Sequence, residues 1–293
     1  MHARLQNLLA IHSAVFLFGL SGLFVKFIEL PSTLIVFGRV FFASIALALL
    51  LLFKQQGIRL QTQKDYLGLA FLGIVLALHW WAFFASIQRS TVAIGVITYS
   101  TFPVFVAFFE PLFFRKQLRG RDILLAIITF AGAVLAIPSL EFGSHMVQGA
   151  LLGMLSAASF ALLSILNRRY VQRYGSLVIA LYQDVVAALI LFPFILSFSA
   201  TVTSHDVLLI ILLGVVFTAG AHALFIHGMT SIEAKTASII GSLEAVYGIF
   251  FAALLLSEIP SMRTLVGGGV VLLATMYATS MVSSHDQTSI ATT

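Results

Sequence analysis

Charged residues are scarce in this 293-residue sequence, since Asp, Glu, Lys and Arg together make up only 9% of it. A soluble domain carries about 25% of such residues, because water must solvate its surface. Apolar residues reach 60%, and the mean hydropathy is +1.07. This composition excludes an ordinary soluble protein and predicts an all-α integral membrane protein that crosses the bilayer several times.

Cysteine is absent and there are only six prolines. The absence of cysteine excludes disulfide scaffolds, thiolate metal sites and cysteine nucleophiles. The sequence also lacks the G-x-x-x-x-G-K-[ST] nucleotide loop and the Gly-x-Ser-x-Gly and His-Glu-x-x-His patterns of hydrolases. We therefore expect no cofactor, no bound metal, no nucleic-acid partner and no enzymatic activity.

Long apolar runs separated by short polar breaks are the main feature of the chain. A helix needs about 20 mostly apolar residues to cross a bilayer. We predict ten transmembrane helices, at residues 8–28, 33–53, 66–86, 92–114, 121–138, 147–167, 176–197, 206–228, 235–257 and 262–282. The loops between them are too short to form a separate domain, so the function is expected to reside inside the helix bundle.

The positions of Lys and Arg predict the orientation. Twelve of the sixteen lie in segments on the side of the N-terminus, and Arg39 lies within a span. The opposite side has only Lys26, Arg89 and Arg263. Because cytoplasmic loops are enriched in basic residues, we expect a multi-pass protein of the cell (inner or plasma) membrane with both termini in the cytoplasm.

An internal repeat is indicated when the sequence is shifted by 141 residues against itself. Residues 72–75 (LGIV) then align with residues 213–216 (LGVV), and the first two helices align more weakly at a slightly larger shift. We predict two five-helix repeats, residues 1–140 and 141–293, the second ending in a short polar cytoplasmic tail. An odd number of helices inverts the second repeat, an arrangement typical of secondary transporters that work by alternating access around a midplane cavity.

Several short segments resemble the drug/metabolite transporter superfamily, in its EamA-like branch. They are residues 79–84 (HWWAFF), 90–95 (STVAIG), 99–105 (YSTFPVF) and 254–258 (LLLSE). The likeness extends over the whole chain, although Phe18-Gly19 replaces a frequent Trp-Gly and Gln117 replaces a usual acid, whereas Glu258 is kept. The resemblance implies a transporter of small organic metabolites, most often an exporter of amino acids or amino-acid-like compounds. An importer or a non-transporting membrane scaffold is the alternative, and a membrane-embedded enzyme is the least expected.

Three ionisable residues within predicted spans are candidates for contact with the cargo. Arg39, Asp184 and Glu244 lie at depths that a long Arg side chain can bridge. Charged groups are costly inside a bilayer, so they usually face a cavity or a partner. These residues are expected to bind a charged or zwitterionic small-molecule substrate or to carry a coupling proton. The alternative is a structural ion pair that fixes helix packing.

Aromatic and polar residues at helical spacing suggest a cavity lining. His79 and Phe83 share a face of the 66–86 helix, with Trp80 beside them. Tyr99 and Tyr247 lie on the fourth and ninth helices, and Pro103 predicts a bend in the fourth. The predicted substrate-binding set is His79, Trp80, Phe83, Tyr99, Arg39, Asp184, Glu244 and Tyr247. Packing in the core is the alternative, and we expect a monomer or a weak homodimer in the lipid bilayer.

Overall fold

The computed structural model describes residues 2–114, 120–138, 141, 143–199 and 201–290. All secondary structure in these ranges is helical. The elements in chain order are α1 His2–Ser21, α2 Phe24–Phe27, α3 Ser32–Phe53, α4 Gln63–Arg89, α5 Val92–Tyr99, α6 Phe102–Phe114, α7 Gly120–Ala136, α8 His145–Tyr170, α9 Ser176–Ile195, α10 Ser204–Leu212, the π-helix η1 Leu213–Gly220, α11 Ala221–Gly228, α12 Ala234–Ser242, α13 Glu244–Leu256 and α14 Met262–Ile290. Gln117, one of the departures from the family pattern, falls outside the described residues.

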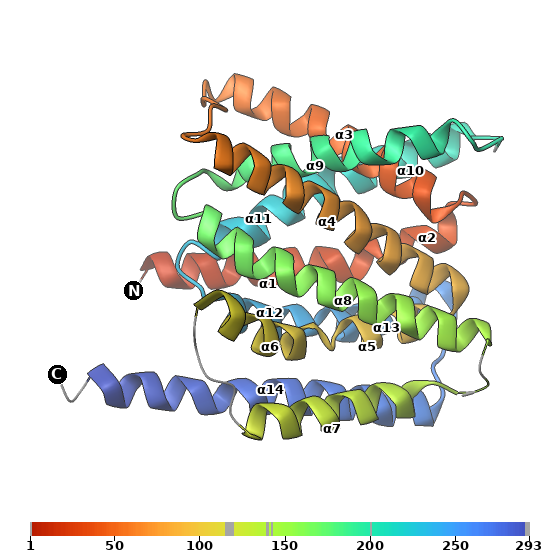
Figure 1. Ribbon diagram of the computed structural model, residues 1–293. Helices are drawn as coiled ribbons and strands as arrows, with labels where there is room; N and C mark the ends of the chain where they lie inside the picture. The colour runs from red at the N-terminus through yellow and green to blue at the C-terminus, as the bar shows by residue number, and fades with distance from the viewer. Residues whose placement is uncertain (1, 115–119, 139–140, 142, 200, 291–293) are drawn as a thin grey trace.

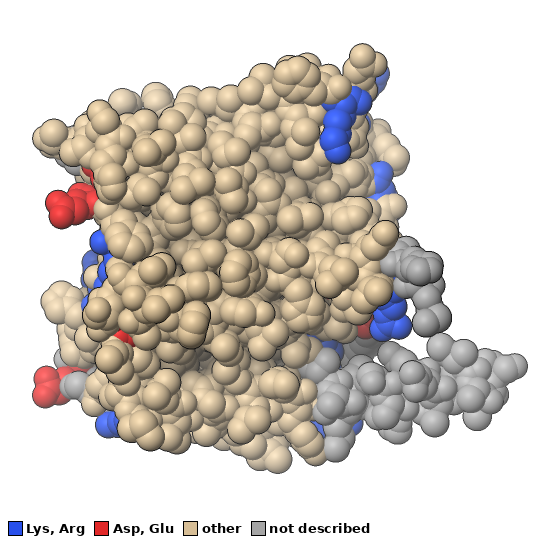
Figure 2. Space-filling model, turned by 180° about the vertical axis from the view of Figure 1, so that it is seen from behind, with Lys and Arg blue, Asp and Glu red and all other residues tan. Residues whose placement is uncertain are grey.

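The helices form a multi-pass membrane protein. Among the described residues, eight helical segments are long and apolar enough to cross a bilayer, and two shorter apolar helices cover Ile123–Ala136 and Met262–Tyr277. Lys, Arg, Asp and Glu lie at the two edges of the face seen in Figure 2, and a broad uncharged band separates them. The prediction of a helical, membrane-spanning protein is confirmed at this level.

Successive segments run back and forth along one axis (Figure 1). Helix α1 leads away from the end of the bundle where α14 finishes, whereas α8 runs in the opposite direction to α1. Likewise α4 runs opposite to the segment formed by α10, η1 and α11. Helix α4 packs against both α8 and α9, and α7 packs against α14. Segments far apart in sequence therefore meet along the centre of the bundle.

Two helices begin with the same cap, 141 residues apart. The Thr62 hydroxyl accepts the Asp65 amide before α4 and donates to the Asp65 carboxylate, at 3.2 and 2.8 Å. Thr203 and Asp206 make the same pair of contacts before α10, at 3.1 and 2.6 Å. Such caps satisfy amides that a helix leaves unpaired at its start. The shared cap shows that the 141-residue spacing applies to local structure as well as to residue identities.

Two long segments are interrupted near the middle of the bundle. The fourth predicted span breaks at Ser100 and Thr101, just before Pro103, as the proline predicted. The ninth breaks at Leu243, where α12 gives way to α13 without a proline. The Ser100 hydroxyl donates to the carbonyl of Ser242 at 3.3 Å, so the two breaks touch each other. Interrupted helices leave backbone groups available where a membrane protein binds polar ligands.

Glycines let neighbouring helices approach closely. A Cβ at Gly153 in α8 would lie 3.0 Å from the Thr98 Cβ, and one at Gly73 in α4 would lie 2.8 Å from the Gln183 carbonyl. In α14, a Cβ at Gly267 would lie 2.6 Å from the Gly132 carbonyl of α7. The small-residue patterns of the sixth and tenth predicted spans thus serve packing within the chain.

Candidate functional site

A cluster of aromatic rings occupies the centre of the bundle where α4, α5 and α8 meet. His79, Trp80 and Phe83 come from α4, Tyr99 from α5 and Phe160 from α8, and each is at most 3% exposed. The His79 ring lies 4.7 Å from Trp80, 5.7 Å from Tyr99 and 4.8 Å from Phe160, centroid to centroid. The structure therefore brings four of the predicted lining residues together. Phe160, whose ring contacts those of His79 and Tyr99, was not predicted.

His79 is held in place by helix α8. Its Nδ1 lies 3.1 Å from the Ser156 carbonyl oxygen and 2.9 Å from the Ser156 hydroxyl. Because a carbonyl oxygen only accepts, its contact requires the proton on Nδ1 and makes Nε2 the acceptor of a neutral imidazole. His79 can thus accept a hydrogen bond from a cationic or hydroxyl-bearing ligand.

Arg39 lies at the edge of the aromatic cluster and is fully buried. Its guanidinium carbon lies 3.6 Å from the centroid of Trp80 and 4.9 Å from that of Phe84, within the range of cation–π attraction. Its Nε donates to the Thr218 hydroxyl at 2.8 Å. Arg39 is therefore fixed on one edge, with its two terminal nitrogens directed elsewhere.

The residue that fixes Arg39 belongs to an unpredicted π-helix. Thr218 lies in η1, and its hydroxyl donates to the carbonyl of Leu213, five residues earlier, at 2.9 Å. That bond leaves the lone pairs of the Thr218 hydroxyl for Arg39. Segments of π-helix are rare and frequently occur at functional sites. Neither hydropathy nor helical periodicity distinguishes a π-turn from an α-turn in an apolar span, so this π-helix could not be predicted.

Arg39 and the two buried acids do not form the direct ion pair that was the structural alternative. No nitrogen of Arg39 lies within 4.0 Å of an oxygen of Asp184 or Glu244. Both terminal nitrogens of Arg39 and both carboxylate oxygens of Asp184 are buried without a hydrogen-bond partner. The charges of Asp184 and Glu244 nevertheless act on Arg39. Arg39 and Asp184 thus lie near each other, and both have buried polar atoms without a hydrogen-bond partner.

Glu244 lies at the break in the ninth segment. It is the first residue of α13 and is 3% exposed. Its charge acts on both Tyr99 and Arg39, which places it beside the aromatic cluster. The N-terminus of a helix stabilises a carboxylate, so this position is favourable for an acidic side chain.

A chain of hydrogen bonds beside Asp184 was missed from the sequence. His222 Nε2 lies 3.1 Å from the Gln183 side-chain oxygen, and the Gln183 amide nitrogen donates to Asn167 at 2.6 Å. All three residues are at most 2% exposed. The signal available was that Gln183 matches Arg39 in the repeat and that uncharged polar groups are also costly within a bilayer.

Tyr247 does not join this cluster. It is half-buried on α13, and its recorded ring contact is with Phe16, 5.3 Å away and 41% exposed. A Cβ at Gly19 would collide with the Tyr247 side chain, because α1 and α13 lie in close contact there. Its position favours a packing role at the α1–α13 interface.

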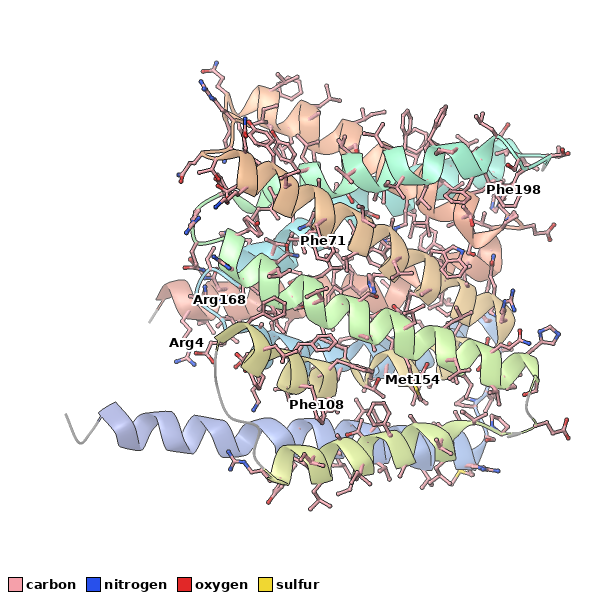
Figure 3. The ribbon with its side chains drawn as sticks, viewed as in Figure 1. Arg4, Phe71, Phe108, Met154, Arg168 and Phe198 are labelled. Atoms are coloured by element: carbon pink, nitrogen blue, oxygen red, sulfur yellow. The ribbon has the colours of Figure 1, made fainter. Side chains whose placement is uncertain are left out.

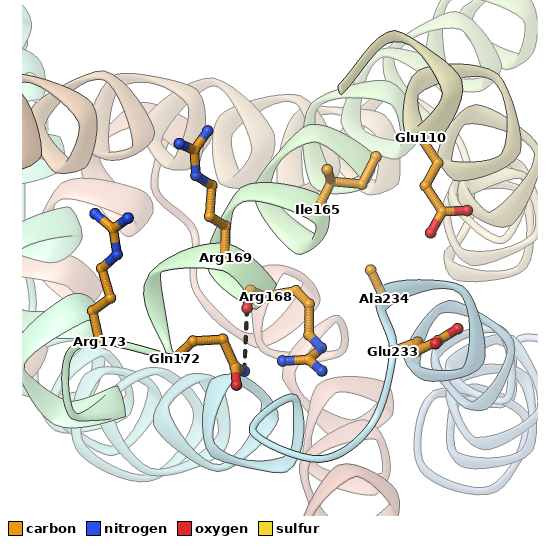
Figure 4. A pocket seen from close by; sticks show the side chains of 8 residues that line it. All are labelled: Glu110, Ile165, Arg168, Arg169, Gln172, Arg173, Glu233 and Ala234. Carbon is orange, nitrogen blue, oxygen red and sulfur yellow. Dashed lines mark hydrogen bonds between the residues drawn. The ribbon is translucent and has the colours of Figure 1, made fainter. Parts of the chain in front are cut away.

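A charged cavity of about 490 Å³ opens at the end of the bundle where the chain begins. Figure 3 places Arg4 and Arg168 at this same end. The lining residues, which we call the inner vestibule, are Glu110, Ile165, Arg168, Arg169, Gln172, Arg173, Glu233 and Ala234. Figure 4 shows Glu110 and Glu233 on one side, Arg169 and Arg173 on the other, and Arg168 between them.

The described residues contain no group of three or more His, Asp or Glu side chains arranged to hold a metal ion. The polar groups in and around the central cluster come from α3, α4, α5, α8, α9, η1, α11 and α13.

Comparison with known proteins identifies the family. The pattern of the EamA-like transporter family matches residues 6–137 and again residues 147–280. The chain belongs to the EamA-like transporter family. Two relatives align over most of their length. An S-adenosylmethionine uptake transporter of Rickettsia bellii is 26% identical over 85% of this chain and 84% of the relative. The pseudopaline exporter CntI of Pseudomonas aeruginosa is 30% identical over 89% of this chain and 91% of the relative.

A solved structure supports the fold of this EamA-like transporter. A crystal structure superposes with a TM-score of 0.69, covering 96% of this chain and 98% of the other at 19% sequence identity. This likeness establishes that the arrangement of helices occurs in a known protein. The named relatives transport in opposite directions, so family membership establishes a membrane transporter without fixing its cargo or direction.

Proposed function

We propose that this EamA-like transporter is a secondary transporter that exports amino-acid-like zwitterions through the central cluster by alternating access. The observation that carries the proposal is the unused hydrogen-bonding capacity of Arg39 and Asp184. A buried charge without a partner costs roughly several kcal/mol. Such groups therefore usually bind a ligand or each other. A zwitterion brings a carboxylate for the guanidinium and an ammonium for the acid.

The aromatic rings beside these charges suit the apolar part of such a cargo. The rings of His79, Trp80, Phe83 and Tyr99 pack against one another, and the guanidinium of Arg39 lies over Trp80. Aromatic faces attract cationic groups as well as apolar ones. One relative is named for the uptake of S-adenosylmethionine, which carries the amino-acid group of methionine, and this supports a cargo of that class.

Alternating access requires two halves that can move against each other, and we propose residues 1–140 and 141–293 as those halves. The twofold family match, the repeated Thr-x-x-Asp caps and the opposite directions of α1 and α8 support ten spans arranged as an inverted repeat. The distribution of Lys and Arg supports cytoplasmic termini in the cell membrane. Coupling to protons would require a titrating acid, and Glu244 and Asp184 are the candidates. We expect the transporter to act as a monomer or weak homodimer.

Counterflow in proteoliposomes tests the proposal. Vesicles are loaded with pooled amino acids or with S-adenosylmethionine, and uptake of the same labelled compound is followed with and without a pH gradient. We expect accelerated exchange of at least one zwitterion. Exchange restricted to amines, to carboxylates without an amino group or to neutral compounds, by protein shown to be folded, would contradict it.

A further inference from the structure

The inner vestibule is distinct from the central cluster and carries its own charge pattern. Arg168, Arg169 and Arg173 come from the end of α8 and the turn after it, whereas Glu233 precedes α12. Arg169 and Arg173 therefore line the wall that faces Glu110 and Glu233, and Arg168 lies between the two walls (Figure 4). A cavity with opposite charges on facing walls attracts a molecule that carries both charges, and it favours neither a simple anion nor a simple cation.

The loop between α11 and α12, which borders the vestibule, is held by hydrogen bonds from α1 and α8 and from the turn after α8. Arg168 Nη1 donates to the carbonyl of Thr230 at 3.5 Å, and the Gln172 side chain donates to the same carbonyl at 3.3 Å. The Asn7 amide of α1 donates to the hydroxyl of Thr230 at 2.9 Å. The loop between α11 and α12 is thus positioned by α1 and α8. Glu233 makes no side-chain cap on α12, which leaves its charge to face the cavity.

The opposite end of the bundle retains only part of this pattern. Lys26, the repeat counterpart of Arg168, donates to the Ser90 carbonyl at 3.4 Å, much as Arg168 donates to that of Thr230. The 141-residue shift places Val92 at the position of Glu233 and Phe251 at that of Glu110. Acids at the outer end, such as Glu29, occupy other positions. The repeat therefore conserves the cation of Arg168 alone: Phe27 and Pro31 stand at the positions of Arg169 and Arg173, and apolar residues replace both acids.

We propose that the inner vestibule is a loading site that selects zwitterions before they reach the central cluster, and that loading is stronger from this side because the outer end lacks the equivalent acids. This inference rests on the proposed transport of zwitterions and adds a second site at which the cargo is recognised. The carboxylate of the cargo contacts the arginines of the vestibule and its ammonium contacts Glu233. Arg39 and Asp184 receive the same two charges deeper in the bundle.

The absence of cysteine allows a clean test that does not depend on flux. In the full-length Gln172→Cys variant, a small methanethiosulfonate reagent reports access to the vestibule. We expect millimolar methionine to slow labelling several-fold, with little effect from its deaminated acid or its decarboxylated amine at the same concentration. Adding Glu233→Gln should abolish protection, and the matched control Glu29→Gln, an exposed acid that does not line the cavity, should retain it.

Each outcome separates the loading site from the proposed function. Equal protection by the deaminated acid, or no protection while counterflow of methionine proceeds, would overturn the loading site and leave transport intact. Protection without counterflow of any compound would support the vestibule and contradict the proposed function. Transport is then measured in membrane vesicles of the two orientations. We expect half-maximal transport at an about five-fold lower cargo concentration from the vestibule side, because exposed charge pairs contribute modestly to binding. Glu233→Gln should bring that ratio close to one, and an unchanged ratio would contradict the proposal.

Discussion

Arg39 and Asp184 are both fully buried in the centre of the bundle, yet they do not bind to each other. The guanidinium stacks on Trp80 and donates to Thr218, and its terminal nitrogens have no partner. The Asp184 carboxylate has none either. This pair of separated, unpartnered groups is the observation on which the proposed binding of a zwitterion rests.

Replacing the guanidinium should weaken cargo binding strongly. Arg39→Gln removes a charged donor, and a hydrogen bond to a charged group contributes about 1.5–3 kcal/mol. We expect the half-saturating concentration in counterflow to rise about ten- to hundred-fold. Arg39→Lys keeps the charge but loses the planar stack on Trp80, so it should rescue binding only in part. Full activity in both variants would remove Arg39 from the binding site.

The π-helix should matter through Thr218. Thr218→Val keeps the side-chain shape but removes the acceptor for the Arg39 Nε, leaving a buried donor unpaired. We expect about ten-fold weaker cargo binding with unchanged helical content by circular dichroism. Thr218→Ser, which retains the hydroxyl, is the matched control and should behave like the wild type. A Val variant that binds normally would show that Arg39 needs no anchor.

Glu244 should link transport to protons. Glu244→Gln is neutral at every pH, so a transporter that uses this acid as its proton carrier should no longer respond to a pH gradient. We expect counterflow to be lost or to become independent of that gradient, while the protein stays folded and inserted. The measurement is uptake at matched and unmatched pH across the vesicle wall. Wild-type flux with wild-type pH dependence would exclude Glu244 from the mechanism.

His79 should affect affinity more than folding. It lies among the rings of Trp80, Tyr99 and Phe160 and is bound by Ser156 through one nitrogen only. We expect His79→Ala to raise the half-saturating concentration with a smaller effect on the yield of folded protein. Ser156→Ala removes only the hydroxyl contact and serves as the control. If His79→Ala lowers the folded yield and leaves affinity unchanged, the residue serves packing alone.

The glycines of α14 offer a test of the packing itself. Gly267→Ala would place a methyl group against the backbone nitrogen of Ala136, which cannot move aside easily. We expect a lower melting temperature in detergent, since overpacking costs about 1–3 kcal/mol. Gly269→Ala points into open space and should melt like the wild type. Equal melting of the two variants would contradict the close contact of α7 and α14.

Composition and periodicity were sufficient for the helices but not for every residue of the site. Apolar runs predicted the eight long apolar segments because bilayer thickness sets the helix length, and Pro103 marked a break because proline removes a backbone donor. Buried ionisable residues were visible as exceptions within apolar runs. Phe160 and Thr218 could not be recognised in this way, because a Phe or Thr within an apolar span does not indicate which helix its side chain faces. Tyr247 lies at the right depth but faces Phe16, because a small rotation about the helix axis separates a lining residue from a packing one.

Counterflow with three related compounds tests the central claim most directly. Proteoliposomes containing the wild type, Arg39→Gln or Asp184→Asn are given the amino acid that exchanges fastest, its deaminated acid and its decarboxylated amine. We predict that the wild type strongly prefers the zwitterion, that Arg39→Gln loses its discrimination against the amine, and that Asp184→Asn loses its discrimination against the acid. If both variants keep the wild-type order of preference, Arg39 and Asp184 do not receive the two charges of the cargo.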